Sequence, residues 1–284
     1  MDLDYVFVPA IDEKSLSDGL QAALNLARDH NGHLSVCRIE QRYPASDVAV
    51  AYWQANTIKS FEDDARALTE RLDQVFTGFC SEHGIEVVDG QAPPRTDAVT
   101  ASWTAVLSDP YKEFGHMARA ADVSVLCRST DESAPLTANV RADLLVRSGV
   151  PLLNVPSERG FTQAKSILVG WNGTVESKRA LTAAMPLIEK AETVSLLSVG
   201  LKNDGRPSAE HVAAVLQRKG IDATGQDLDG HKETDRQVVT AAEEGGIDLM
   251  VIGAYSQPRW RESMFGGMTL RMLNHPPLPV FMVH

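Results

Sequence analysis

The sequence is poor in the features that mark membrane and secreted proteins. No apolar run approaches the roughly 20 residues that a membrane-spanning helix needs. The three cysteines cannot all pair with one another, and they lack the spacing of metal ligands. The first residues are acidic where a secretory signal would be basic. We therefore expect a cytoplasmic protein with no membrane partner and no metal site.

Positive charge is also scarce. The chain has 27 Lys and Arg against 38 Asp and Glu, a net charge of −11, which argues against a general nucleic-acid binder. Residues 1–160 carry 14 basic and 24 acidic residues, a balance of −10, whereas residues 161–284 carry 13 and 14, a balance of −1. An anionic ligand is therefore expected in the second half of the chain.

What the chain does have is a repeated alternation of apolar strand patterns and amphipathic helix patterns. In the first half we predict strands at 5–11, 33–39, 85–88, 123–127 and 151–155, and helices at 15–29, 57–83, 98–107, 112–121 and 139–147. In the second half we predict strands at 166–170, 194–199, 221–223, 249–252 and 279–283, and helices at 175–190, 209–219, 232–244 and 269–274. Such alternation indicates parallel sheets with helices on both faces.

The two halves also repeat at the level of residues. The segment ADVSVLC, which ends at Cys127, matches IDLMVIG, which ends at Gly253, and GVPLLNV matches PLPVFMV. We therefore predict an α/β protein of two tandem doubly wound domains, residues 1–157 and 165–284, each with a mostly parallel five-stranded sheet. A polar linker is expected at residues 158–164.

The stretch Leu249–Thr269, LMVIGAYSQPRWRESMFGGMT, carries the functional prediction. A buried strand ends at Gly253, a basic loop follows, and Gly266 and Gly267 precede a short helix. This arrangement directs free backbone N–H groups at an anion, usually phosphate, and glycine allows that anion to approach the backbone. The alternative interpretation is an ordinary connection between a strand and a helix.

At these residues the chain resembles a tandem universal stress protein of the UspA-like family, in the adenine nucleotide α-hydrolase-like superfamily. The family's pattern is Gly-x2-Gly-x9-Gly-[Ser/Thr]. Its positions and their neighbours correspond here to Ile252, Gly253, Ser256, Gly266, Gly267, Met268 and Thr269. The resemblance implies a site for ATP or another adenine nucleotide, with Mg²⁺ carried on the phosphates rather than on a cage of carboxylates.

The resemblance also implies contacts to the base and the ribose. The family's acidic residue after the first strand corresponds to Asn172, which is followed by Gly173 and Thr174, and the apolar position that packs on adenine corresponds to Val199. Trp171, beside these residues, would either stack on a base or lie in the core. Arg259, Arg261 and Arg271 would either neutralise phosphate or lie on an ordinary solvated surface.

The chain departs from the family pattern in both halves. Ser256 replaces the second glycine, and Gly267 lacks the expected hydroxyl but keeps its backbone N–H. The first half has no glycine between Cys127 and Gly149, and charged residues follow Asp12, which occupies the acidic position. We therefore expect the first half to be a degenerate structural partner.

Three functions stay open. The first is a stress-response protein that binds an adenine nucleotide in its second half and acts as a regulatory binding module, without catalytic residues. The second is an interaction protein of the same fold that binds no nucleotide. The third is a nucleotidyl hydrolase or transferase, but the sequence lacks the Ser-Gly-Gly-x-Asp-Ser and His-x-Gly-His motifs of the superfamily's synthetases.

The last strand of each half follows a proline and would lie at a sheet edge. Exposed apolar edges favour pairing with another strand. We therefore expect the strands PLLNV and PVFMV to join the two halves as an intramolecular pseudo-dimer. A further homodimer and an unidentified protein partner stay open.

Overall fold

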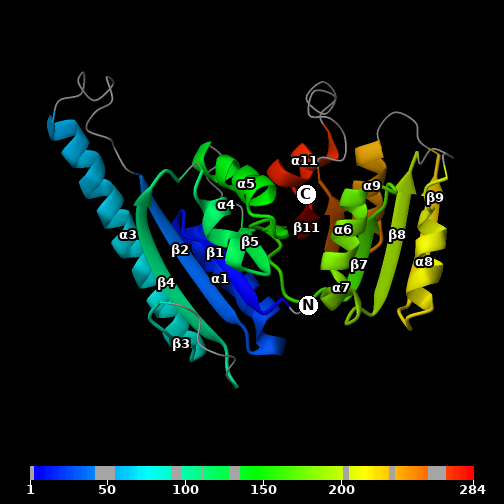
Figure 1. Cartoon of the computed structure of the whole chain (residues 1–284), viewed down its shortest axis with the longest axis horizontal. Helices are drawn as coiled ribbons and strands as arrows, with labels where there is room; N and C mark the ends of the chain where they lie inside the picture. Colours follow the sequence, from blue (N-terminus) through cyan, green and yellow to red (C-terminus); the bar gives the residue numbers. More distant parts are fainter. Residues whose placement is uncertain are drawn as a thin grey trace.

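The computed structural model describes residues 3–41, 55–90, 97–110, 112–127, 135–200, 205–229, 234–254 and 267–284. The described strands form one 11-stranded sheet in the order β3-β4-β2-β1-β5-β6-β11-β10-β7-β8-β9 (Figure 1). Strand β6 pairs with β11 in antiparallel orientation, and the other described pairs are parallel.

Each half has the same doubly wound strand order. The strands of the first half are β1 (Tyr5–Pro9), β2 (His33–Gln41), β3 (Glu86–Val87), β4 (Thr100–Ser108), β5 (Val123–Cys127) and β6 (Leu152–Val155). Those of the second half are β7 (Ser166–Gly170), β8 (Thr193–Val199), β9 (Ala223–Leu228), β10 (Leu249–Gly253) and β11 (Val280–Val283). The orders β4-β2-β1-β5-β6 and β9-β8-β7-β10-β11 correspond strand for strand, so the predicted fold class is confirmed. The two-residue strand β3 is an addition at the outer edge of the first half.

Helices cover both faces of the sheet. One face packs against α1 (Glu13–Ala27), α3 (Ala55–His83), α6 (Val175–Ala183), α7 (Met185–Ile188) and α8 (Ala209–Gln217). The other packs against α4 (Phe114–Met117), α5 (Pro135–Arg147), α9 (Thr234–Glu244) and α11 (Met268–Asn274). Two short 3₁₀ helices, η1 (Arg28–His30) and η2 (Ala118–Ala120), follow α1 and α4. No helix in the described ranges is both long and apolar enough to cross a membrane.

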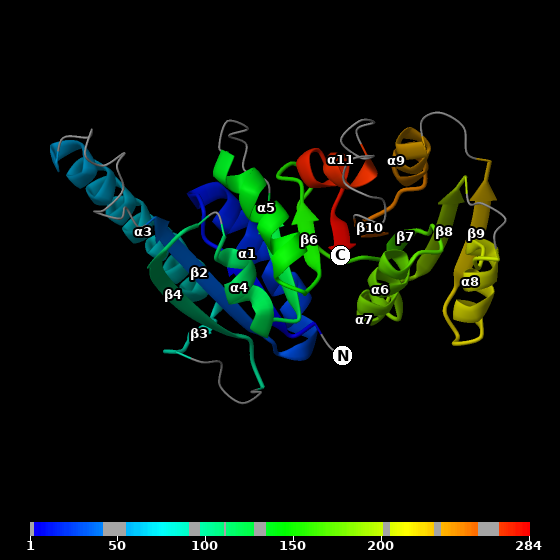
Figure 2. The same cartoon turned by 45° about the horizontal axis from the view of Figure 1, so that its top comes forward.

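Strands β6 and β11 join the halves, as the sequence predicted for these two strands. Phe281 lies opposite Leu153 in their register, and both side chains are fully buried. The side-chain amide of Asn154, also in β6, donates to the backbone oxygens of Met272 and Leu273 in α11, at 2.7 and 3.1 Å. The first half therefore supplies donors for the last carbonyl groups of a helix in the second half. In Figure 2 the two strands lie in the middle of the molecule.

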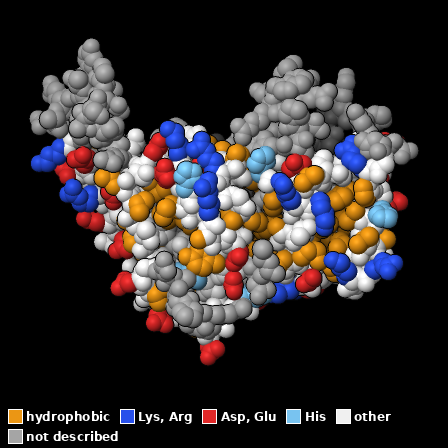
Figure 3. All heavy atoms as spheres, viewed as in Figure 1, with side chains coloured by type: hydrophobic (Ala, Val, Ile, Leu, Met, Phe, Trp, Pro, Cys, Tyr) orange, Lys and Arg blue, Asp and Glu red, His pale blue; other side chains and the backbone are white. Residues whose placement is uncertain are grey.

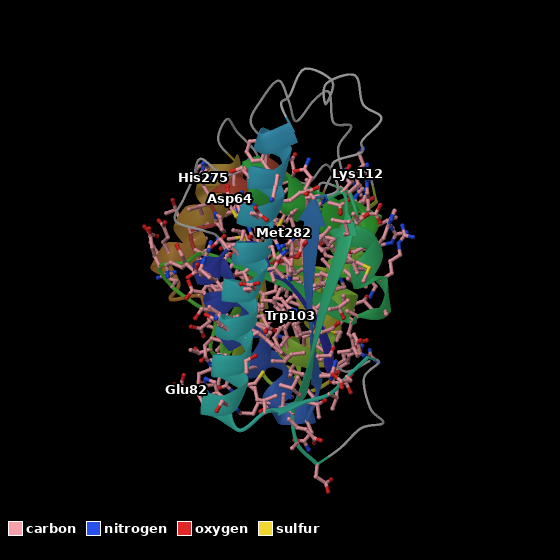
Figure 4. The ribbon with its side chains drawn as sticks, turned by 90° about the vertical axis from the view of Figure 1, so that its left-hand side faces the viewer. Asp64, Glu82, Trp103, Lys112, His275 and Met282 are labelled. Carbon is pink, nitrogen blue, oxygen red and sulfur yellow. The ribbon has the colours of Figure 1, made fainter. Side chains whose placement is uncertain are left out.

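The helix predicted at residues 98–107 is wrong, because the segment forms strand β4. Thr100, Trp103, Thr104 and Val106 are β-branched or aromatic, and such residues favour a pleated surface over a helix. The Trp103 ring packs against the Phe76 ring of α3 in a tilted arrangement, with ring centroids 5.5 Å apart. Figure 4 shows Trp103 on the sheet, with α3 running along the molecule in front of it.

Smaller differences concern where elements begin and end. The helix predicted at 175–190 is two helices, α6 and α7, separated at Ala184, two residues before Pro186. The strand predicted at 221–223 is β9, which begins at Ala223 and continues to Leu228. The domain boundaries and the linker at 158–164 stay predictions. Phe161, inside that segment, is buried, and its carbonyl accepts a hydrogen bond from the Asn25 side chain at 2.7 Å.

The structure explains one of the repeated residue pairs. The Asp248 carboxylate accepts hydrogen bonds from the backbone N–H groups of Lys165 and Ser166, at 3.0 and 2.9 Å, where β7 begins. The Asp122 carboxylate accepts from the N–H of Tyr5, at 2.9 Å, where β1 begins. Asp122 therefore ties β1 to the segment before β5, and Asp248 ties β7 to the segment before β10, which is a structural role.

Candidate ligand site at the carboxyl ends of strands β7 and β10

The second half has a topological switch point between β7 and β10. The chain leaves β7 toward β8 and β9 on one side, and returns to β10 and β11 on the other. In open parallel sheets, ligands bind in the crevice outside the carboxyl ends of the strands at such a point. The residues that follow β7 and end β10 there are those that the sequence analysis selected.

A tight turn follows β7. The Asn172 side-chain oxygen accepts hydrogen bonds from the Thr174 backbone N–H, at 3.2 Å, and from its hydroxyl, at 2.8 Å. Gly173 has φ of +68°, in the left-handed region that favours glycine. Thr174 is the N-cap of α6, and its hydroxyl accepts from the N–H of Ser177 at 3.4 Å. The turn is therefore built by its own side chains.

Gly253, at the end of β10, lies directly against the start of α6. A Cβ at this position would lie 2.5 Å from the backbone carbon of Glu176 and from the nitrogen of Ser177. The glycine is therefore required by helix packing, whether or not a ligand binds. Ile252, the residue before it, is buried and lies opposite Gly170 of β7.

Val199, the last residue of β8, is half-buried and packs against the core on the α9 and α11 side of the sheet. Trp171 lies in the core on the opposite side, with 5% of its surface exposed. Its ring N–H donates to the carbonyl of Pro207 at 2.8 Å. Of the two interpretations of Trp171, the structure supports the core residue.

The two halves fill the same core position differently. The equivalent registers of β1 with β2 and β7 with β8 align Ala10 with Trp171, and Arg38 with Ser198. The first half has a small residue, Ala10, directly after the first strand and a buried arginine on the second, whose guanidinium donates to the Ala10 carbonyl at 3.3 Å. The second half has the Trp171 indole directly after its first strand and a buried serine on the second. A large and a small residue have exchanged places between the halves.

Helix α11 begins at the third group of predicted site residues. Gly267 is its N-cap, with φ of −57° and ψ of 154°, and no side chain caps this end of the helix. Thr269 is buried and Met268 packs against the core. Arg271 is exposed in the same helix. Four residues named in the sequence analysis, Ser256, Gly266, Arg259 and Arg261, lie outside the described residues.

The structure adds one residue that the sequence analysis missed. The Arg206 guanidinium donates to the Asn172 carbonyl at 3.1 Å, and its Cβ would lie 2.9 Å from a Cβ placed on Gly173. A basic residue in the loop after the second strand was the available signal, because the carboxyl ends of parallel strands meet at one edge. Arg206 therefore brings a positive charge to the switch point.

The corresponding turn in the first half is closed by acidic residues. The Asp12 carboxylate accepts from the backbone N–H of Ser15 at 2.9 Å, as the N-cap of α1, and Glu13 pairs with Arg71 at 2.8 Å. Figure 3 shows acidic side chains along the lower left of the drawn face, over the first half, with Lys and Arg side chains above them. This electrostatic setting disfavours a polyanion. Within the described residues, no cluster of His, Cys, Asp and Glu could hold a metal ion.

Comparisons with known proteins support the architecture. No protein-family model and no curated protein matches the sequence. A universal stress protein from Archaeoglobus fulgidus matches the structure with a TM-score of 0.67 and 14% sequence identity, covering 99% of this chain and 96% of that one. The chain has the universal stress protein fold. A protein of unknown function from Pseudomonas aeruginosa matches with a TM-score of 0.51 and 12% identity, over 98% and 92% of the two chains. At sequence identities this low, the matches show the fold and do not establish an activity.

Proposed function

We propose that this protein is a stress-response protein that binds ATP, or another adenine nucleotide, in its second half and acts as a regulatory binding module. The proposal rests on the universal stress protein fold and on the switch point between β7 and β10. The turn at Asn172 and Gly173 lies at the edge of the sheet where such folds bind ligands.

Electrostatics also favours the second half. Its net charge is −1, against −10 for residues 1–160, and Arg206 lies against the turn. The basic residues Arg259 and Arg261 follow β10 in the sequence. A polyphosphate therefore meets less repulsion here than in the first half. Mg²⁺ would travel with the phosphates.

One observation favours a second candidate, an interaction protein that binds no nucleotide. The Asn172 oxygen is already bonded within the turn, and Gly253 is explained by its contact with α6. Both residues would be retained by the fold alone. The two candidates differ in a measurable way, because only the first retains nucleotide.

Equilibrium dialysis with labelled ATP and Mg²⁺ tests the proposal. We expect the wild-type chain to retain ATP, and Gly266→Leu to weaken retention by tenfold or more, about 1.4 kcal/mol, because a side chain would hold the phosphate away from the backbone. The matched control is Gly78→Leu on α3, where an added Cβ meets nothing within 4 Å. Loss of retention in both variants, or no retention by the wild type at millimolar ATP, would remove the proposed site.

A further inference from the structure

A cleft of about 240 Å³ lies between the segment that joins the halves and the amino ends of β10 and β11. Arg159–Gln163 line one side, and Gly246–Asp248 with Pro279 line the other. The proposed nucleotide site lies at the carboxyl ends of the strands, so the cleft is at the opposite end of the sheet. Pockets between structural units are frequent ligand sites.

Two side chains of opposite charge line this cleft without pairing with each other. Within the described part of the chain, the Arg159 guanidinium has no hydrogen bond or ion pair. The Asp248 carboxylate uses Oδ2 for the backbone N–H groups at the start of β7, which leaves Oδ1 without a described donor. The nearby ammonium of Lys165 pairs with Glu192 at 2.8 Å. One cationic group and one carboxylate oxygen are therefore available in the same small space.

The walls of the cleft are held in place. Phe161 is buried, and its carbonyl accepts from the Asn25 side chain, so the Arg159 side of the cleft is anchored to the first half. Gly160 and Gly246 have φ of +57° and +60°, one on each side of the cleft. A Cβ at either glycine would meet nothing within 4 Å, so the space beside them is open. The cleft is thus both anchored and accessible.

A guanidinium binds a carboxylate through two parallel hydrogen bonds, and a carboxylate oxygen binds an ammonium group. The volume is below the roughly 300–1,000 Å³ of pockets for larger organic ligands, so the ligand is small. A molecule that carries both charges can use Arg159 and Asp248 at once, whereas a molecule with a single charge can use only one of them. We propose that this cleft binds a free α-amino acid, with its carboxylate on Arg159 and its ammonium group on Asp248.

The test uses the full-length chain and L-alanine as the probe, with binding followed by ligand-detected NMR and isothermal titration calorimetry. We expect Arg159→Gln and Asp248→Asn each to weaken L-alanine binding by tenfold or more. The side-chain amide in Asp248→Asn keeps an oxygen for the two N–H groups of β7, so this variant is expected to fold. Acetate and ethylamine, which each carry one of the two charges, should bind at least tenfold more weakly than L-alanine.

Two matched controls separate this site from general charge effects. Asp122→Asn changes the equivalent strand cap in the first half, away from the cleft, and Arg218→Gln removes an exposed arginine next to α8. Both should bind L-alanine like the wild type. If Asp248→Asn melts at a lower temperature than Asp122→Asn, its weaker binding could reflect a folding defect. The binding of L-alanine by Arg159→Gln then tests the proposal alone. Failure of the wild type to bind at tens of millimolar L-alanine, or unchanged binding in Arg159→Gln, overturns the proposal.

Discussion

At the scale of single residues, His33 shows how burial sets a charge state. Its ring nitrogens lie 2.9 Å from the hydroxyls of Thr100 and Ser102, and the side chain is almost fully buried between β2 and β4. Burial lowers the pKa of His33 from 6.5 to about 4, because the charged ring would lose its hydration. The native state therefore holds a neutral histidine at physiological pH.

The lowered pKa of His33 predicts that the free energy of unfolding depends on pH in the acid range. Between pH 6.5 and about 4 the unfolded chain binds a proton at His33 that the native chain does not. The free energy of unfolding should therefore fall across this range by on the order of 3 kcal/mol. Urea unfolding at several pH values measures it. His33→Gln should lose this component and His116→Gln, at an exposed position, should keep it. The same pH dependence in both variants would contradict the assignment.

The cysteines give a second prediction at this scale. All three are buried, and burial raises the pKa of Cys37 to about 12 and of Cys80 to about 11, and raises that of Cys127 as well. Because the thiolate is the reactive form, a thiol reagent should label the native protein only as fast as it opens. Rapid labelling without denaturant would show that a thiol is accessible. Full labelling in urea is the positive control.

At the scale of elements, most strands and helices could be predicted because their apolar periods are regular and their ends are marked. The first helical segment, predicted at 15–29, ends at His30, and Asn31 follows it with φ of +49°. The exceptions are β4 in the first half and β9 in the second. Strand β4 contains alanines that suit a helix, and its residues become more exposed toward its end, so the buried pattern of an inner strand is lost. Its strand character comes from pairing with β2 along nine residues, which is a tertiary effect.

Only part of the candidate site could be predicted from the sequence, because some of its contacts join segments that are far apart in the chain. The turn after β7 and the N-cap at Thr174 are made by neighbouring residues, and the sequence analysis selected these residues through the family resemblance. The contact of Arg206 with Asn172, and of Gly253 with α6, joins elements that are far apart in the chain. In the first half the large buried residue is Arg38, on the second strand, whereas in the second half it is Trp171, after the first strand. This difference can be recognised only when the strand registers are known.

The close packing of β10 against α6 at Gly253 predicts how a substitution there changes the free energy of unfolding. Gly253→Ala would force β10 and α6 apart, since the new Cβ lies 2.5 Å from backbone atoms, and should cost about 1–3 kcal/mol. Gly78→Ala, at an exposed position in the C-terminal part of α3, should instead be neutral or raise stability by about 0.5–1 kcal/mol. Chemical denaturation of both variants measures the difference. Equal stability of the two would refute the packing argument.

At the scale of the whole molecule, the two halves share one sheet and both hydrophobic clusters. Each cluster contains buried residues from the first and the second half, such as Val125 and Val251 on one face, and Leu152 and Met282 on the other. We therefore expect a single cooperative thermal transition, in which the calorimetric and van't Hoff enthalpies agree. Differential scanning calorimetry tests this. Two resolved transitions would mean that the halves unfold independently.

The whole-molecule view also gives the first half a purpose that does not need a ligand. Its strand β6 completes the sheet beside β11, and Asn154 holds the end of α11, the helix that starts at the predicted phosphate-binding glycines. A half with acidic turns can thus support the half that we propose binds nucleotide.

The central claim is that the second half holds an adenine nucleotide. Mass spectrometry of the small molecules released when freshly purified protein is denatured tests it most directly. We expect an adenine nucleotide in near-stoichiometric amount from the wild type and its absence from Gly266→Leu. Protein that releases no nucleotide, even after incubation with millimolar ATP and removal of the excess, would contradict the claim.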